Sequence, residues 1–253
     1  MSERPKLAAS RRSHADSHPP VPHFKNRVLP EVFPDVTEPG RARRITFAVA
    51  RNGCIVKLAA KSSRMKPSQL ILIVLAALAL LAGIELSMGR SFFGPDGKFG
   101  WWESSIWSSE NSQRVADAYS FSHFIHGISF YALLWIVARK LPVEKRLLLA
   151  LVLEASWEVL ENSPLIINRY REATAALGYT GDSVLNSMSD VVMMALGFLF
   201  ACRVKPAISW ITVAIMEIGC ALWVRDNLTL NIIMLVHPVA AIKQWQLAGQ
   251  PMP

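Results

Sequence analysis

Cysteine is scarce in this sequence, with three residues among 253. Cys54, Cys202 and Cys220 are odd in number, and the last two lie inside apolar segments. This arrangement provides neither a disulfide framework nor the paired spacing of a cysteine metal site. Small buried hydrophobic residues are the simpler interpretation. Internal repeats are lacking too, which excludes a solenoid.

Net charge is absent from most of the chain. Residues 65–253 contain 14 Lys and Arg against 14 Asp and Glu, whereas residues 1–64 contain 13 against 5. The excess of +8 therefore belongs to the first quarter of the sequence. Because 52% of the residues are hydrophobic and the mean hydropathy is +0.28, the composition is too apolar for an ordinary soluble domain. A basic head joined to a membrane-embedded body is predicted.

The head, residues 1–64, holds seven of the 15 prolines and shows no apolar periodicity, so we expect it to be disordered. Pro, Asp and Glu interrupt it, which is unlike a secretory signal. Its charge would suit anionic lipid or nucleic acid, but a solvated tail explains it as well, and we expect no nucleic-acid partner. Alternatively, the protein starts at Met65, and the head reflects a start codon assigned too early.

Long apolar runs are frequent in the body, and a helix that crosses about 30 Å of hydrocarbon needs about 20 such residues. Five runs meet or approach this length, at 69–88, 119–138, 147–165, 183–202 and 208–224. A sixth run, 228–242, is short and contains Pro238, so it would cross the membrane, re-enter it or lie at its surface. The predicted fold class is all-α, with an integral membrane helical bundle of five or six spans over residues 65–253.

Short loops that carry Lys and Arg mark the cytoplasmic side of a membrane protein. Two loops of this body are basic, at 139–146 and at 203–207. Placing both in the cytoplasm gives an alternating path in which the N-terminus is also inside. The segment 91–118 then lies outside, and its Trp101, Trp102 and Trp107 are typical of rings anchored at a headgroup boundary.

Ionisable residues inside a membrane usually face a bundle interior or a wet cavity, and here they recur at helical spacing on three spans. The stripes are Tyr119, His123, His126 and Phe130 on the second span, Glu154, Glu158 and Glu161 on the third, and Asp182, Ser183, Asn186 and Asp190 on the fourth. The directions of crossing place all three polar stripes toward the outer side, so we expect them to meet at similar depth.

These stripes predict a site in which His123, His126, Glu158 and Asp190 perform acid–base chemistry. Glu161, Asp182, Asn186, Arg169 and Arg171 would contact the substrate, with the two arginines binding a phosphate or carboxylate. His126 is expected within hydrogen-bond or single-water reach of Glu158 or Asp190.

A divalent-metal site from His123, His126 and Glu158 or Asp190 is a sharper version of this hypothesis. The i, i+3 histidine pair is compatible with metal binding but is not the HExxH pattern. Alternatively, the polar groups only hold the spans together. The sequence does not decide between an enzyme and a non-enzyme.

The stretch GYTGDSVLNSMSD at 178–190 contains two further signals. Asp182 and Ser183 suit the start of a helix, where short oxygens satisfy free backbone N–H groups. The GDSVL word is similar to the nucleophile block of GDSL-type hydrolases, but that block ends a strand in a soluble domain, whereas here a membrane span follows. We therefore prefer the capping role for Ser183. Glu217 is expected to be an interhelical partner, and His237, beside Pro238, to be structural.

The words WEVLEN, NRYRE and GYTGDSVLNSMSD, with SHFIHGISFY before them and RDNLTLNIIML after them, resemble an uncharacterised family of alphaproteobacterial polytopic inner-membrane proteins. The resemblance extends from Met65 to Gln246. It implies a multi-pass protein of the bacterial inner membrane and supplies no activity. Members of that family lack the long basic head, which supports the alternative start at Met65.

A fainter likeness extends to VanZ-like membrane proteins, which have a span with His, an acidic span, an Arg, and a span that begins with Asp or Asn and ends in Gly, here Gly197. Those proteins have Asp-Lys before the His, where this chain has Phe121 and Ser122. The likeness is therefore an analogy, which cannot establish function.

Taken together, these patterns predict a protein of the lipid bilayer with a polar pocket that opens outward. It would bind, modify or move a lipid-linked or amphiphilic envelope molecule. The alternative is a non-enzymatic scaffold or assembly factor. A small transporter is disfavoured because paired broken helices are lacking. The pattern does not identify the ligand, a cofactor beyond the metal hypothesis, or the oligomeric state.

Overall fold

The structure, a computed structural model, describes residues 65–250. The disorder expected of residues 1–64 concerns residues outside this range. Within it the chain forms helices without a strand, and one isolated bridge joins Trp102 to Ala116. The helices are α1 (Pro67–Ser87), α2 (Ser120–Val137), α3 (Val143–Glu161), α4 (Pro164–Ala173), α5 (Val184–Arg203), α6 (Pro206–Val224), α7 (Leu228–Val236) and α8 (Ala240–Leu247). The all-α prediction is confirmed.

Four of these helices, α1, α2, α5 and α6, are long and apolar enough to cross a membrane. Their bounds lie within two residues of the apolar runs in the sequence. α3 has a similar length of 19 residues, but six Asp, Glu, Lys or Arg side chains lower its hydropathy. The helical bundle has the character of a membrane protein.

Prolines explain where the structure departs from the expected spans. The run 147–165 was expected to form one span, but α3 ends at Glu161 and α4 begins at Pro164. Proline suits the first turn of a helix because it lacks the N–H group that would stay unpaired there. The run 228–242 is divided near Pro238 into α7 and α8. At about 1.5 Å per residue, neither is long enough to cross the hydrocarbon.

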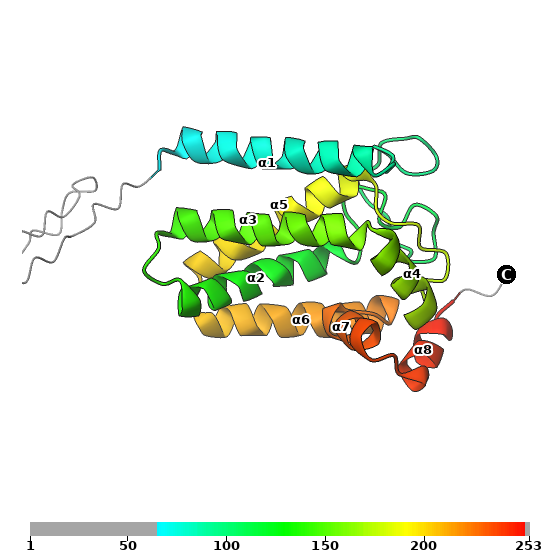
Figure 1. The fold of residues 1–253 in the computed structure, drawn as a ribbon. Coiled ribbons are helices and arrows are strands. Elements are labelled where there is room, and N and C mark those ends of the chain that lie inside the picture. Colours follow the sequence, from blue (N-terminus) through cyan, green and yellow to red (C-terminus); the bar gives the residue numbers. More distant parts are fainter. Residues whose placement is uncertain (1–64, 251–253) are drawn as a thin grey trace, which may run out of the picture. The chain divides into compact units, whose positions relative to one another are not determined.

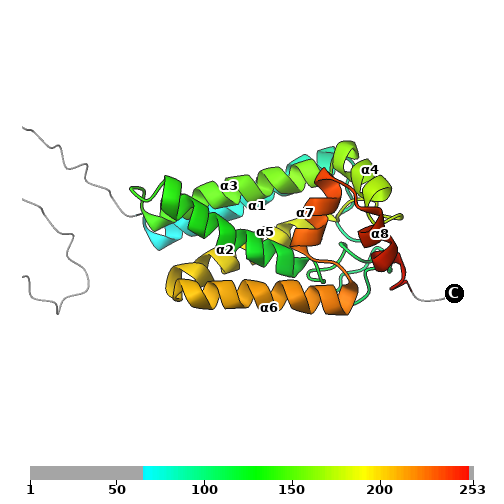
Figure 2. The ribbon, with the colours of Figure 1, turned by 90° about the horizontal axis from the view of Figure 1, so that it is seen from below.

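The connections between the long helices gather at two ends of the bundle (Figure 1). The start of α1, the α2–α3 turn and the α5–α6 turn lie together, and we call this the short-loop end. The segment 88–119, α4, α7 and α8 lie at the opposite end, which we call the loop-rich end (Figures 1 and 2). The three polar stripes are all at the loop-rich end of their helices, as the alternating path requires.

α2 and α5 pack in direct backbone contact at the centre of the bundle. A β-carbon on Gly127 would overlap the Met194 carbonyl oxygen, and one on Gly197 would overlap that of Phe124. Met194 and Phe198 are fully buried and belong to the apolar core beside this contact. The outward faces of α1 and α6 are exposed and apolar instead, with Leu222 81% exposed, as is suitable for contact with lipid.

Candidate functional site

A cavity of about 780 Å³ lies at the loop-rich end of the bundle. Helices α2, α3, α5 and α7 contribute to its wall, together with the segments around 107–113 and 174–182. The acidic, basic and histidine residues in its lining are His123, His126, Glu154, Glu161, Asp182, Asp190, Arg225 and Asp226. Carboxyl groups therefore outnumber fixed positive charges in the wall.

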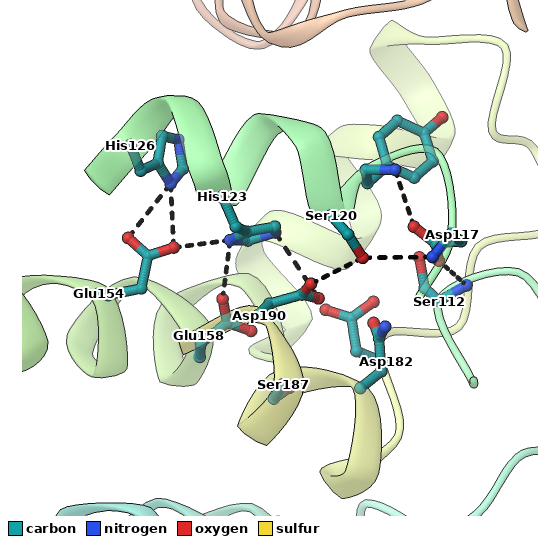
Figure 3. Close-up of polar contacts among 12 residues, drawn as sticks. Ser112, Asp117, Ser120, His123, His126, Glu154, Glu158, Asp182, Ser187 and Asp190 are labelled. Carbon is teal, nitrogen blue, oxygen red and sulfur yellow. Dashed lines mark hydrogen bonds and ion pairs between the residues drawn. The ribbon is translucent and has the colours of Figure 1, made fainter. Parts of the chain in front are cut away.

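His123 of α2 lies at the centre of the polar cluster (Figure 3). Its Nδ1 lies 2.6 Å from Oε1 of Glu154 and 3.3 Å from Oε1 of Glu158. Its Nε2 lies 3.7 Å from Oδ2 of Asp190 on α5. One imidazole thus contacts carboxyl groups from two helices, and the expected meeting of the three polar stripes is present around it.

His126 follows one turn later on α2 and contacts a different partner from the one expected. Its Nδ1 lies 3.0 Å and 3.2 Å from the two carboxylate oxygens of Glu154. The expected partners, Glu158 and Asp190, lie against His123 instead. The two histidines therefore share Glu154, a residue that the acidic stripe contained but that was not assigned to the site (Figure 3).

Glu158 and Glu161 differ in how their carboxylates are satisfied. Both oxygens of Glu158 are buried without a hydrogen-bond partner, and the side chain is 0% exposed. Glu161 is only partly buried and lines the cavity together with Tyr170 and Trp157. A buried polar group without a hydrogen-bond partner lowers the stability of the folded protein. Glu158 is the member of the cluster whose carboxylate oxygens lack such partners.

A chain of hydrogen bonds connects Asp190 to the loop before α2. The hydroxyl of Ser120 donates to Oδ1 of Asp190 at 3.2 Å and accepts from the backbone N–H of Asp117 at 3.2 Å. Asp117 in turn accepts from the backbone N–H groups of Ser112 and Tyr119. Burial raises the pKa of Asp117, and these backbone donors oppose the shift. The network fixes Asp190 beside His123.

Asp182 is held at the cavity wall directly before α5. Its backbone N–H donates to Oδ1 of Asn162 at 2.7 Å, and its Oδ1 accepts from the Tyr179 hydroxyl at 2.9 Å. Its carbonyl oxygen accepts from Nε of Arg90 at 3.0 Å. Burial raises the pKa of the Asp182 carboxyl from 3.8 to about 7.

Ser183 caps α5, as the sequence indicated. Its side chain accepts from the backbone N–H of Asn186 at 3.2 Å, and it is fully buried. A side chain engaged in this way is poorly placed to act as a nucleophile. Asn186 also lines the cavity, and its Nδ2 donates to the carbonyl oxygen of Arg114 at 2.9 Å.

The structure does not bring Arg169 and Arg171 into the cavity. Both belong to α4, where Nε of Arg169 donates to the Leu235 carbonyl at 2.8 Å and Nε of Arg171 donates to the Tyr179 carbonyl at 2.5 Å. These bonds tie α4 to α7 and to the loop before α5. The geometry supports a structural role for both rather than the expected anion binding.

Other residues at the site were not assigned from the sequence. Asp226 accepts from the Tyr119 hydroxyl at 3.2 Å and from Nε2 of Gln246 at 3.0 Å, and burial raises its pKa to about 7. These contacts close the wall from the α6–α7 connection and α8. An acid two residues after an apolar span was the available signal at Asp226. Glu217 accepts from the backbone N–H groups of Leu228 and Thr229, so it is an interhelical partner as expected.

The sequence of the chain is similar to those of a family whose function is not known. A family model described as a protein of unknown function (DUF2585) matches residues 85–248. A UPF0314 protein of Sphingopyxis alaskensis is 49% identical over 182 residues, which cover 70% of this chain and 95% of the relative. A UPF0314 protein of Agrobacterium fabrum is 51% identical over 179 residues, which cover 69% and 89%. No solved structure matches the chain. The expected uncharacterised alphaproteobacterial family is confirmed.

Proposed function

The chain belongs to the DUF2585 family, and we propose that it binds the polar head of a lipid-linked or amphiphilic envelope molecule in the cavity and acts on it by acid–base chemistry. The observation that carries this proposal is the convergence of two imidazoles and several carboxyl groups on the wall of one cavity of about 780 Å³. This volume falls within the range of small-molecule sites.

The composition of the cavity wall supports an amphiphilic ligand. Apolar side chains share the lining with the polar cluster, namely Ile106, Phe130, Leu153, Leu177, Ile232 and Leu235. A chain or ring of the ligand would contact this apolar part, while its head would reach His126 and Glu154. Because carboxyl groups dominate the polar part, hydroxyl and amino groups fit the head better than a bare phosphate.

The same wall supports proton transfer. A general acid or base must lie within hydrogen-bond reach of the group it serves and of the side chain that orients it. Glu154 contacts both His123 and His126. Asp190 contacts His123, and a hydrogen bond from Ser120 holds the Asp190 carboxylate in that position. Proton donors and acceptors therefore lie side by side at the cavity wall, with their positions fixed by neighbouring helices.

The location of the cavity supports the proposed side of the membrane. Basic residues cluster at the short-loop end, at Arg139, Lys140, Arg203 and Lys205, and such loops remain in the cytoplasm. The loop-rich end and its cavity would then open on the outer side of the inner membrane. An envelope molecule in the outer leaflet would have direct access to it.

The hydrogen-bond chain from Asp117 through Ser120 to Asp190 favours a second candidate, a scaffold whose polar groups only join helices. A fully paired cluster would suit that role. A scaffold role does not explain the large cavity or the Glu158 oxygens that lack a hydrogen-bond partner. The ligand-binding function therefore accounts for more of the site.

The test fills the cavity without changing its acidic residues. Ala176 lines the cavity between α4 and α5, so Ala176→Trp should displace the ligand. Ala207→Trp adds the same indole to an exposed position of α6 at the short-loop end and serves as the control. Lipids that co-purify in mild detergent are identified by mass spectrometry. We expect the parent protein and the control to carry an amphiphile that Ala176→Trp has lost. Equal amounts of amphiphile in all three proteins would refute the proposal.

A further inference from the structure

We infer that His123, His126, Glu154 and Glu158 form a site for one divalent first-row metal ion, such as Zn²⁺. The inference rests on the proposed function in that the ion would act in the same cavity. His123, His126 and Glu154 each offer a ligand atom, and these atoms lie within 4.8 Å of one another. Glu158 adds a fourth candidate ligand beside His123.

The spacing of the ligand atoms suits an ion held by His123, His126 and Glu154, while Glu158 lies beside His123 in a second group that it forms with Glu161. Ligand atoms at about 2.1 Å from an ion lie about 3.0 to 3.4 Å apart in octahedral or tetrahedral geometry. Nδ1 of His126 lies 3.0 Å from Oε1 of Glu154, and Nδ1 of His123 lies 3.3 Å from Oε1 of Glu158. The 2.6 Å between His123 and Glu154 would open by a few tenths of an ångström.

Glu158 provides an independent observation that points to a bound cation. Its side chain is 0% exposed, and neither carboxylate oxygen has a hydrogen-bond partner. The contact of 3.3 Å between its Oε1 and Nδ1 of His123 is an ion pair only when that imidazole is protonated. An ionised carboxylate in such surroundings is strongly destabilised unless a cation neutralises it. Figure 3 shows this carboxylate pointing toward His123, on the side where the cluster converges. A cation there would supply the absent partner.

The proton positions on His123 also favour a metal. If a neutral His123 carried its proton on Nδ1, the lone pair of Nε2 would face the carboxylate of Asp190 at 3.7 Å. With a metal on Nδ1, the proton lies on Nε2 and points at Asp190. A carboxylate that accepts from the second nitrogen of a ligating histidine is the usual outer partner in metal sites. Ser120 holds Asp190 in that place.

Charge and access agree with this assignment. Two ionised carboxylates and two neutral imidazoles carry a net charge that one divalent ion balances. Imidazole and carboxylate together suit Zn²⁺ and its neighbours in the first row. His123, His126 and Glu154 line the cavity, so a substrate group could reach an open coordination position. The ion would polarise that group, while Asp190 and Glu161, which also line the cavity, would transfer protons.

The test measures metal binding directly and needs no amphiphile. The full chain is purified in detergent, stripped with a chelator and titrated with Co²⁺, whose visible spectrum reports its ligands. We expect about one ion per chain and a rise in unfolding temperature on binding. His126→Ala and Glu158→Gln should each weaken binding at least tenfold. The controls His237→Ala and Glu172→Gln remove the same groups from exposed positions and should bind like the parent.

The metal inference would be overturned if the parent protein did not bind Co²⁺, or if the two site variants bound it as tightly as the parent. Equal weakening in the two controls would overturn it as well, because binding would then lie elsewhere. Unfolding temperatures measured in the stripped state show whether Glu158→Gln, which preserves the shape of the side chain, is folded. If Co²⁺ binds as expected while the Ala176→Trp experiment fails, only the proposed amphiphile function is lost.

Discussion

Gly197 of α5 lies so close to Phe124 of α2 that a β-carbon at position 197 would overlap the Phe124 carbonyl oxygen. Gly127 approaches the backbone of α5 in the same way. Ser120 and Asp190, which share a hydrogen bond of 3.2 Å, each lie seven residues, or about two helical turns, before one of these glycines. The close contact therefore sets the register that places Asp190 beside His123.

We predict that Gly197→Ala separates the two helices and destabilises the protein. Overpacking a closely packed contact costs about 1–3 kcal/mol, and the neighbour here is backbone that cannot rotate away. Unfolding temperature in detergent is the measurement. Gly83→Ala is the matched control, because position 83 lies in α1 with no neighbour within 4 Å of an added β-carbon. A Gly197→Ala protein as stable as Gly83→Ala would contradict the proposed register.

Stability should depend on pH through Asp182. Because burial raises its pKa from 3.8 to about 7, the folded protein retains a proton between these values that the unfolded chain has released. The contribution of this group to stability is therefore greatest at low pH and falls as pH rises from about 4 to about 7. Asp182→Asn should remove this slope, which is at most about 1.4 kcal/mol per pH unit.

Chemical denaturation at several values between pH 5 and pH 8 measures this effect. Asp96→Asn is the control, because a hydrogen bond from Arg114 lowers the pKa of Asp96 and keeps it ionised throughout that range. Parallel stability curves for the parent and Asp182→Asn would show that Asp182 does not retain its proton.

Orientation is tested by reporter fusions at the two ends of the bundle. Fusions after Lys140 and Lys205, at the short-loop end, should report a cytoplasmic location, because Lys and Arg there resist translocation. A fusion after Gly100, at the loop-rich end, should report an external location. A cytoplasmic signal from Gly100, or an external one from Lys140, would place the cavity on the wrong side for the proposed ligand.

Periodicity in the sequence was sufficient to predict most of the helices and the faces that meet. The stripes on α2, α3 and α5 required only helical spacing and the cost of charge in hydrocarbon. Spacing identifies a face but not the depth at which two faces meet. Glu154 and Glu158 share one face of α3, so the sequence did not decide which of them contacts His126. That choice depends on the register between α2 and α3.

The roles of Arg169 and Arg171 could not be predicted for a different reason. In the sequence they follow the acidic stripe of the third span by about ten residues, and the two guanidinium groups were expected to bind a phosphate or carboxylate there. In the structure they lie on α4, and their guanidinium groups bond to carbonyl oxygens of Leu235 and Tyr179. Such acceptors belong to backbone from distant segments, which spacing along the sequence does not reveal.

Native mass spectrometry of Asp190→Asn tests the central claim most directly, because one spectrum reports both the fold and the bound molecule. The substitution retains the shape of the side chain and an oxygen that accepts from Ser120, and it removes the charge beside His123. We predict a compact, folded protein that has lost the amphiphile carried by the parent. A variant that retains the amphiphile in full, or one that unfolds, would contradict a ligand site and favour polar groups that only join helices.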